Sequence, residues 1–197
     1  ANPHPGLLRL LRRRGAAIDA VSPGEVEAAR RAGFPASRIL FTGTSVSAED
    51  LRRVFAVRGV TVNIDAVEQL ELMRAVRLQD FPGRRIRVSV RWNPGLGRGF
   101  NPKVVTAGAC SSDGTPIKFG IAEELVGGTL ERARAYGFEP AGLHQHLGSG
   151  WTAEDYPAVR AAVGKHMGRA RRLERAGLRR EFLDCGGGVG PRDQAGQ

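Results

Sequence analysis

Short apolar segments and longer amphipathic segments alternate along the whole sequence. Apolar runs of about four to eight residues between turn residues are typical of buried strands, and apolar residues spaced three or four apart are typical of helices. Since a parallel strand can be reached only through a crossover, this alternation predicts an α/β fold with a parallel sheet. The predicted strands are 16–21, 38–41, 60–64, 86–92, 140–147 and 182–185, and the predicted helices are 5–14, 23–33, 48–58, 66–78, 122–136 and 154–176.

Several helix ends carry local signals. Ser22 and Ser47 each precede a predicted helix, where a serine hydroxyl accepts a hydrogen bond from a free amide of the first turn. Glu25 stands three residues after Ser22, which completes a capping pattern. Gly33 is a typical helix stop. The boundaries in this part of the chain therefore follow from neighbouring residues.

Both an open doubly wound sheet and a closed barrel fit the alternation. The open sheet typically carries a GxGxxG fingerprint after its first strand, and residues 19–24 lack it. Polar residues and glycines instead lie at the carboxyl ends of many different strands, as in a barrel, where all strand ends converge on one mouth. A barrel usually needs about eight strands, so the six predicted here form an incomplete one. The residues at these strand ends are Asp19, Thr42, Gly43, Asp65, Arg91, His146–Ser149 and Gly186–Gly188.

The chain is strongly basic, with 30 Lys and Arg against 20 Asp and Glu and a formal net charge of +10 in 197 residues. Such a charge is common in nucleic-acid-binding proteins. Only Lys103, Lys118 and Lys165 are lysines, so the excess is nearly all Arg, scattered over the polar faces of predicted helices. With 6% aromatic residues, the basic and aromatic interleaving of single-strand binders is missing. We therefore expect a solvated basic surface and no nucleic-acid partner.

The cysteines and the chain ends bear on the cellular compartment. Cys110 and Cys185 form no CxxC pair, which argues against a disulfide framework or a zinc cluster and fits a reduced cytoplasm. No apolar run approaches the length of a membrane span, and no signal-peptide pattern opens the chain. We expect a cytoplasmic protein without a membrane partner. Because the sequence starts at Ala1 without Met, we also expect it to be a piece of a longer protein.

Two histidines and two glycine-rich turns are the candidate functional residues. In a strand over 140–147, His144 and His146 would face the same side and could chelate a metal. A third ligand is missing, so we expect no metal site, and ordinary core histidines are an alternative. Ser149 with its flanking glycines, and the run Gly186–Gly188, are typical of phosphate-binding turns because no Cβ blocks close approach; simple tight turns are the alternative.

Four segments together carry a family resemblance: residues 18–25 (IDAVSPGE), 118–121 (KFGI), 142–149 (GLHQHLGS) and 183–188 (LDCGGG). At this spacing the chain resembles the barrel domain of the fold type III pyridoxal-phosphate-dependent decarboxylases, the family of the diaminopimelate, ornithine and arginine decarboxylases. The KFG and HxHxGS segments and Arg91-Trp92-Asn93-Pro94 are most similar to the diaminopimelate decarboxylases. The resemblance implies a (β/α)8 TIM barrel of the alanine racemase-like type, incomplete, with about six of eight strands.

The same resemblance implies what the chain lacks. In the family, the first strand ends in Lys-Ala-Asn, whose lysine forms the Schiff base with pyridoxal 5'-phosphate, and this sequence opens at Ala1-Asn2. We therefore expect residues 1–197 to be a partial cofactor-binding barrel without its first and last strands, without a catalytic residue and without the C-terminal β domain. Such a piece should be inactive and poorly soluble by itself, because the strands beside the gap become bare edges.

Roles for individual residues also come from the resemblance. His146 would stack on the cofactor ring, with His144 lining the same wall. Ser149 and Gly186–Gly188 would bind the phosphate. Asp19 would lie near the Schiff-base lysine. The supporting residues would be Arg91, paired with carboxylates beneath the cofactor, and Lys118, in a structural or subunit contact at the start of the next helix.

The implied activity is decarboxylation of an amino acid, with meso-2,6-diaminopimelate as substrate and lysine biosynthesis as the pathway, in a homodimer. The alternatives left open are an ornithine, arginine or carboxynorspermidine decarboxylase or a racemase of the same fold, and a non-catalytic binding protein that resembles a decarboxylase. An Arg-rich nucleic-acid binder is the third, for which binding would fall steeply with salt.

Overall fold

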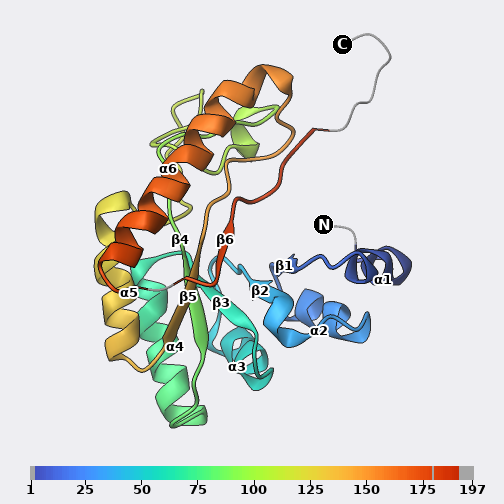
Figure 1. Ribbon diagram of the computed structural model, residues 1–197, viewed down its shortest axis with the longest axis vertical. Helices are drawn as coiled ribbons and strands as arrows, with labels where there is room; N and C mark the ends of the chain where they lie inside the picture. Colours follow the sequence, from blue (N-terminus) through green and yellow to red (C-terminus); the bar gives the residue numbers. More distant parts are fainter. Residues whose placement is uncertain (1–2, 179, 191–197) are drawn as a thin grey trace. The chain divides into compact units, whose positions relative to one another are not determined.

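The computed structural model describes residues 3–178 and 180–190 (Figure 1). Strands and helices alternate along them, as the sequence predicts. The strands are β1 (Ile18–Ala20), β2 (Ile39–Phe41), β3 (Thr61–Ile64), β4 (Arg87–Arg91), β5 (Glu139–His144) and β6 (Phe182–Asp184). The helices are α1 (Pro5–Arg13), α2 (Pro23–Arg31), α3 (Ala48–Ala56), α4 (Val67–Asp80), α5 (Val126–Ala135) and α6 (Tyr156–Arg175), with 3-10 turns η1 (Ala36–Arg38), η2 (Pro102–Val104), η3 (Glu123–Leu125) and η4 (Ala153–Asp155).

The strands follow one another in the sheet in sequence order, β1-β2-β3-β4-β5-β6. β1 pairs with β2, β2 with β3 and β5 with β6, each in parallel. In a doubly wound sheet the strand order reverses at a switch point, whereas a barrel keeps the order of the chain because every crossover has the same hand. The predicted fold class, part of a (β/α)8 barrel, is therefore confirmed.

The chain divides into two compact units, Ala1–Ser89 with Gly128–Ala141 and Val90–Gly127 with Gly142–Gln197. The first unit consists of short strand and helix repeats whose helices begin at capping residues. Ser22 Oγ accepts a hydrogen bond from Glu25 N over 3.2 Å, as predicted. Ser47 and Asp50 form a reciprocal capping box at the start of α3. Local side chains therefore satisfy the free amides at both helix starts.

The core of the first unit is built from apolar residues of its strands and helices. Phe41, Leu51 and Ile64 are fully buried. Phe55 lies at the centre of an aromatic group, with its ring 5.9 Å from Phe81 and 6.4 Å from Phe138. Edge and tilted contacts of this kind add to the stabilisation from buried area.

The second unit is less regular, because a long segment without α-helix follows β4. Asn93 connects the start of this segment to Gly108 by two hydrogen bonds of 2.8 Å, one donated by Nδ2 and one accepted by Oδ1. Ala107, Leu147 and Ala162 form a small buried cluster beneath it. Long-range backbone contacts therefore order this segment in place of regular secondary structure.

Two predicted boundaries are wrong in the second unit. The strand predicted to run to Leu147 ends at His144, because the next residues turn to pair with a different segment. The helix predicted from Ala122 begins with the 3-10 turn η3 and becomes α-helical at Val126. No helix within the described residues is both long and apolar enough to cross a membrane.

Candidate functional site

The ends of β5 and β6 bring the two predicted binding motifs together in the second unit. His144 pairs in register with Asp184, and Gln145 N donates to Asp184 O over 3.0 Å. Neighbouring parallel strands end at the same edge of a sheet, so the segments that follow them meet there. Gly187 N lies 3.4 Å from His146 Nδ1 in a long hydrogen bond. The imidazole of His146 and the glycine run thus lie side by side, as the sequence predicts.

The two histidines differ in environment. His144 is 1% exposed at the end of β5, whereas His146 is half-buried beyond the strand. The strand predicted to carry both histidines stops before His146, so strand alternation does not set the direction of its ring. A separate contact holds His146, whose carbonyl accepts a 2.9 Å hydrogen bond from Thr106 Oγ1.

The glycine run serves as a tight turn at two of its three positions. Gly186 and Gly188 have φ values of 72° and 96°, a region that favours glycine. A Cβ at Gly188 would lie 1.9 Å from Gly148 O, and one at Gly186 would lie 2.6 Å from His146 Nδ1. Nothing lies within 4 Å of a Cβ built at Gly187. The turn therefore leaves open space at Gly187, where a ligand group can approach the backbone.

Ser149 is exposed, but its backbone is already engaged. Its N–H donates to Val104 O over 3.2 Å and its carbonyl accepts from Phe100 N over 3.0 Å. The backbone amide of Ser149 is therefore not available to a phosphate. The exposed hydroxyl is the group of Ser149 that can bind an anion.

Asp19 belongs to the first unit and lies in β1, one residue before the strand ends. It is exposed, and the hydroxyl of Thr42 donates a hydrogen bond to its carboxylate. Asp19 lies near the end of β1, and Thr42 directly follows β2, its paired strand. The role of Asp19 toward the cofactor lysine stays a prediction. Ala1 and Asn2, which belong to the expected Lys-Ala-Asn motif, lie outside the described residues.

The two supporting residues meet at one aromatic ring. Arg91 is 6% exposed and its guanidinium lies 4.8 Å from the centroid of Phe119, a cation–π contact. Lys118 is exposed, with Nζ 5.4 Å from the same ring. Lys118 does not open a helix as predicted, because Ile121 pairs with Trp92 before η3 begins. The predicted carboxylate partners of Arg91 and the subunit contact of Lys118 stay predictions.

One buried polar pair, Trp92 and His166, is not predicted from the sequence. The Trp92 Nε1–H donates to His166 Nδ1 over 2.6 Å. His166 lies on the buried face of α6 with Ala162, Ala170 and Leu173. A histidine at an apolar position of a helical period was the available signal, since a buried imidazole needs a partner.

The chain is similar to proteins and solved structures of known function. The diaminopimelate decarboxylase of Methanothermobacter thermautotrophicus is 38% identical over 192 residues, which are 96% of this chain and 41% of that protein. That of Zymomonas mobilis is 32% identical over 193 residues, 98% of this chain and 44% of that protein. The crystal structure of diaminopimelate decarboxylase from Helicobacter pylori complexed with L-lysine matches with a TM-score of 0.86 at 26% identity, covering 99% of this chain and 48% of that one.

This chain therefore spans about half the length of the proteins it resembles. The family described as "Pyridoxal-dependent decarboxylase, pyridoxal binding domain" matches over residues 1–197. The predicted resemblance is confirmed, and with it pyridoxal phosphate as the cofactor. The chain belongs to the pyridoxal-binding domain family of the pyridoxal-dependent decarboxylases.

Proposed function

We propose that this chain forms the cofactor-binding part of a diaminopimelate decarboxylase, which converts meso-2,6-diaminopimelate to L-lysine and CO2. The observation that carries the proposal is the contact of His146 with the glycine turn, where Gly187 N lies 3.4 Å from Nδ1. Two relatives named diaminopimelate decarboxylase support the choice of reaction. A similar structure holds L-lysine, the product of the proposed reaction.

The residues at this edge suit pyridoxal phosphate in two ways. The half-buried imidazole of His146 offers a flat face for an aromatic ring. Open space lies beside Gly187 where a Cβ would stand, and the exposed hydroxyl of Ser149 is a neutral hydrogen-bond donor suited to phosphate. When bound, the cofactor withdraws electrons from the α-carbon of the amino acid, so that the carboxylate can leave as CO2.

The chain's own residues hold and orient the bound molecule. His146 would hold the cofactor ring, and its own carbonyl is held by Thr106. The positive φ values of Gly186 and Gly188 set the direction of the turn, so that Gly187 faces open space. His144 at the end of β5 and Arg91 at the end of β4 are both buried. Holding the bound amino acid in one orientation would favour cleavage of a single bond.

We also propose that the full-length protein works as a homodimer in the cytoplasm, with an amino acid as its ligand and neither nucleic acid nor membrane as a partner. The distribution of charge supports a solvated basic surface. Arg169 and Arg172 both bind Glu123, at 2.8 and 2.7 Å. Arg52 binds Asp80 at 2.7 Å. Arginines balanced in this way by carboxylates are poorly suited to bind a phosphate backbone.

Substrate assays on the full-length protein that contains this chain test the proposal. The protein is loaded with pyridoxal phosphate and offered meso-2,6-diaminopimelate, L-ornithine, L-arginine or carboxynorspermidine. We expect CO2 and an equal amount of L-lysine from the first compound alone. CO2 from another compound instead would identify a different decarboxylase of this fold, and epimerisation without CO2 a racemase. Cofactor binding with no turnover at all would identify a binding protein.

A pair of variants tests whether His146 belongs to the cofactor site. His146→Ala removes the flat face, so we expect a large loss of cofactor affinity in equilibrium dialysis. His4→Ala changes a histidine that is exposed beside α1 and serves as the control. Equal cofactor affinity in both variants would remove His146 from the site.

A further inference from the structure

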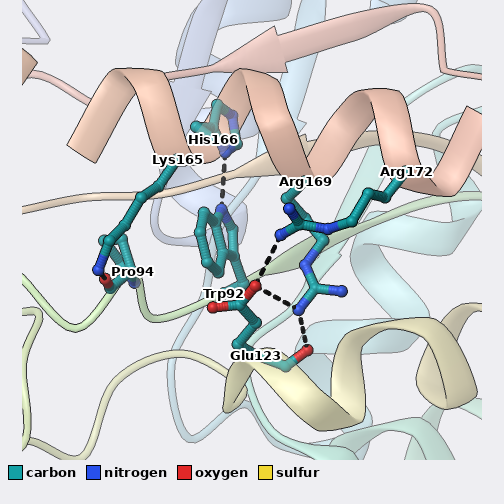
Figure 2. A network of polar contacts seen from close by, with 7 residues as sticks. All are labelled: Trp92, Pro94, Glu123, Lys165, His166, Arg169 and Arg172. Atoms are coloured by element: carbon teal, nitrogen blue, oxygen red, sulfur yellow. Dashed lines mark hydrogen bonds and ion pairs between the residues drawn. The ribbon is translucent and has the colours of Figure 1, made fainter. Parts of the chain in front are cut away.

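Trp92 and His166 form a buried polar pair in the second unit (Figure 2). Trp92 directly follows β4 and is 1% exposed, and His166 lies in the middle of α6 and is 0% exposed. Their ring centroids are 6.0 Å apart and their planes differ by 8°. Together with the 2.6 Å bond between Nε1 and Nδ1, these values place the rings edge to edge in nearly one plane. This is the geometry that an N–H donor and a ring acceptor require.

The hydrogen bond fixes the protonation state of His166. Because Nδ1 accepts from the indole, the neutral imidazole carries its proton on Nε2. Burial, and then the nearby His144, lower the pKa of His166 to about 4, with the Leu143 carbonyl acting in the opposite direction. His166 therefore remains a hydrogen-bond acceptor through the pH range in which an ordinary histidine becomes charged.

The pair is not the most stable way to fill this space. His166 Nε2 has no well-formed hydrogen bond among the described residues. Two apolar side chains of similar volume would pack here without any buried polar atom. The hydrogen bond adds a fixed orientation, because it favours the one rotamer of the indole in which Nε1 points at His166.

Trp92 in turn joins the ends of two strands. Its backbone N–H donates to His144 O over 3.0 Å. Ile121 N donates to Arg91 O over 2.8 Å, and Asn93 N donates to Ile121 O over 2.9 Å. The peptide groups on both sides of Trp92 thus connect β4, β5 and the segment before η3. The position of the Trp92 backbone is therefore coupled to the strand ends that carry Arg91 and His144.

Neighbouring residues of α6 hold the same region from outside. Lys165 Nζ donates to Pro94 O over 3.1 Å, two residues after Trp92. Figure 2 shows Arg169 and Arg172 converging on Glu123 at the start of η3. The Arg169 guanidinium also lies 6.0 Å from the Trp92 ring centroid. α6 therefore contacts the residues just after β4 and the start of η3, and the buried His166 lies between these contacts along the helix.

We propose that His166 is a positioning residue for the cofactor site, which acts by holding the Trp92 indole and, through it, the strand ends that carry Arg91 and His144. It touches neither cofactor nor substrate. The proposal rests on the cofactor site described above and is independent of which amino acid is decarboxylated.

Four single variants of the full-length protein, and the double variant that combines His166→Leu with Trp92→Phe, test this role. His166→Leu removes the acceptor, and Trp92→Phe removes the donor. His166→Asn keeps an acceptor oxygen on a short side chain and does not titrate. Met167→Leu, at a half-exposed position next to His166, is the matched control for α6. The measurements are pyridoxal phosphate affinity by dialysis, the visible circular dichroism of the bound cofactor, and the melting temperature.

We expect His166→Leu and Trp92→Phe each to weaken cofactor binding about tenfold and to change the visible circular dichroism at saturating cofactor. The double variant should be no weaker than either single variant, because both remove the same bond. His166→Asn and the control should stay within about twofold of the parent protein. If His166→Leu does not fold, the difference in cofactor affinity and circular dichroism between Trp92→Phe and His166→Asn decides the test.

A lower melting temperature with unchanged affinity and dichroism in His166→Leu and Trp92→Phe would overturn the proposal, because it would make the pair merely structural. Additive losses in the double variant would also overturn it. A full-length protein that binds the cofactor as expected but releases no CO2 from diaminopimelate would contradict the proposed function and leave the role of His166 standing.

Discussion

The two compact units of this chain are ordered by different kinds of contact. In the first unit, helices start at side chains that bind amides three residues away, as Ser22 does with Glu25 and Ser47 with Asp50. In the second unit, the segment after β4 is held by partners far along the chain. Arg98 N, for example, donates to Leu147 O over 2.9 Å. The candidate cofactor residues other than Asp19 lie in the unit that is ordered by distant contacts.

This difference explains how a segment without helix or strand can still adopt one defined conformation. A loop whose backbone groups pair with another strand end is nearly as fixed as a strand, although its residues carry no periodic pattern. A local cap sets only where a helix begins. Substitutions that break distant contacts should therefore cost more than those that break local caps, and they should act on cofactor binding as well as on stability.

The largest effect should come from Gly188→Ala. The added Cβ would lie 1.9 Å from Gly148 O, and the residue has a φ of 96°. Steric overlap and an unfavourable backbone region together should cost about 4 kcal/mol of unfolding free energy. Urea unfolding of the full-length protein measures the loss, and cofactor affinity should fall with it.

Gly187→Ala is the matched control for that substitution. Nothing lies within 4 Å of its added Cβ, so the free energy of unfolding should change little. Its cofactor affinity should nevertheless fall, because the methyl group fills the open side of the turn. Equal unfolding free energies for the two variants would contradict the geometry of the turn.

Acidification should destabilise the second unit through His166, with a loss of about 3 kcal/mol between pH 6.5 and pH 4. Burial first, and then His144 on β5, lower the pKa of His166 in the folded protein to about 4 from an ordinary value of 6.5. Between these values the unfolded chain binds a proton that the folded chain does not. Stability therefore falls as the pH falls through this window.

Unfolding free energies measured across this pH range, for the parent protein and His166→Asn, isolate the effect. Carboxylates with lowered pKa values, such as Asp50 and Asp113, titrate in both proteins and cancel in the difference. Identical pH dependence in the two proteins would show that His166 is not buried in the neutral form.

The contrast between the units also explains what the sequence could predict. The starts of α2 and α3 were predicted because Ser22 and Ser47 act on amides a few residues away. The contact of His146 with the glycine run was predicted from the resemblance and from the rule that parallel strand ends meet at one edge.

Other parts of the site depended on contacts that no local pattern encodes. The end of β5 at His144 and the engaged amide of Ser149 both result from pairing with residues 98–106, some 40 positions earlier. The partner of His166 is Trp92, 74 positions away. A periodic pattern reveals which face of α6 is buried, but it cannot identify what that face contacts.

Asn93→Ala should cost about 2 kcal/mol, because the Asn93 side chain bonds both backbone groups of Gly108 and also accepts from Gly95 N. Asn101→Ala is the matched control in the same segment, where Asn101 Oδ1 accepts a local bond from Lys103 N. The loss of unfolding free energy, measured with urea, should be less than half of that for Asn93→Ala. A larger loss of unfolding free energy for Asn101→Ala than for Asn93→Ala would contradict the prediction that distant contacts contribute more to stability than local ones.

Ser47→Ala should have the smallest effect, about 1 kcal/mol, because it removes one local cap of the first unit. Ser47 Oγ accepts from Asp50 N and donates to the Asp50 carboxylate. These contacts, and first the bond from Ser47 N, lower the pKa of Asp50, so the variant should move that pKa back toward its ordinary value in an NMR titration. Ser37→Ala, at an exposed position in η1, controls for loss of a hydroxyl.

The cofactor affinity of Ser47→Ala should stay unchanged, because α3 lies in the other unit from His146. A loss of affinity comparable to that of Gly187→Ala would mean that the two units do not order themselves independently.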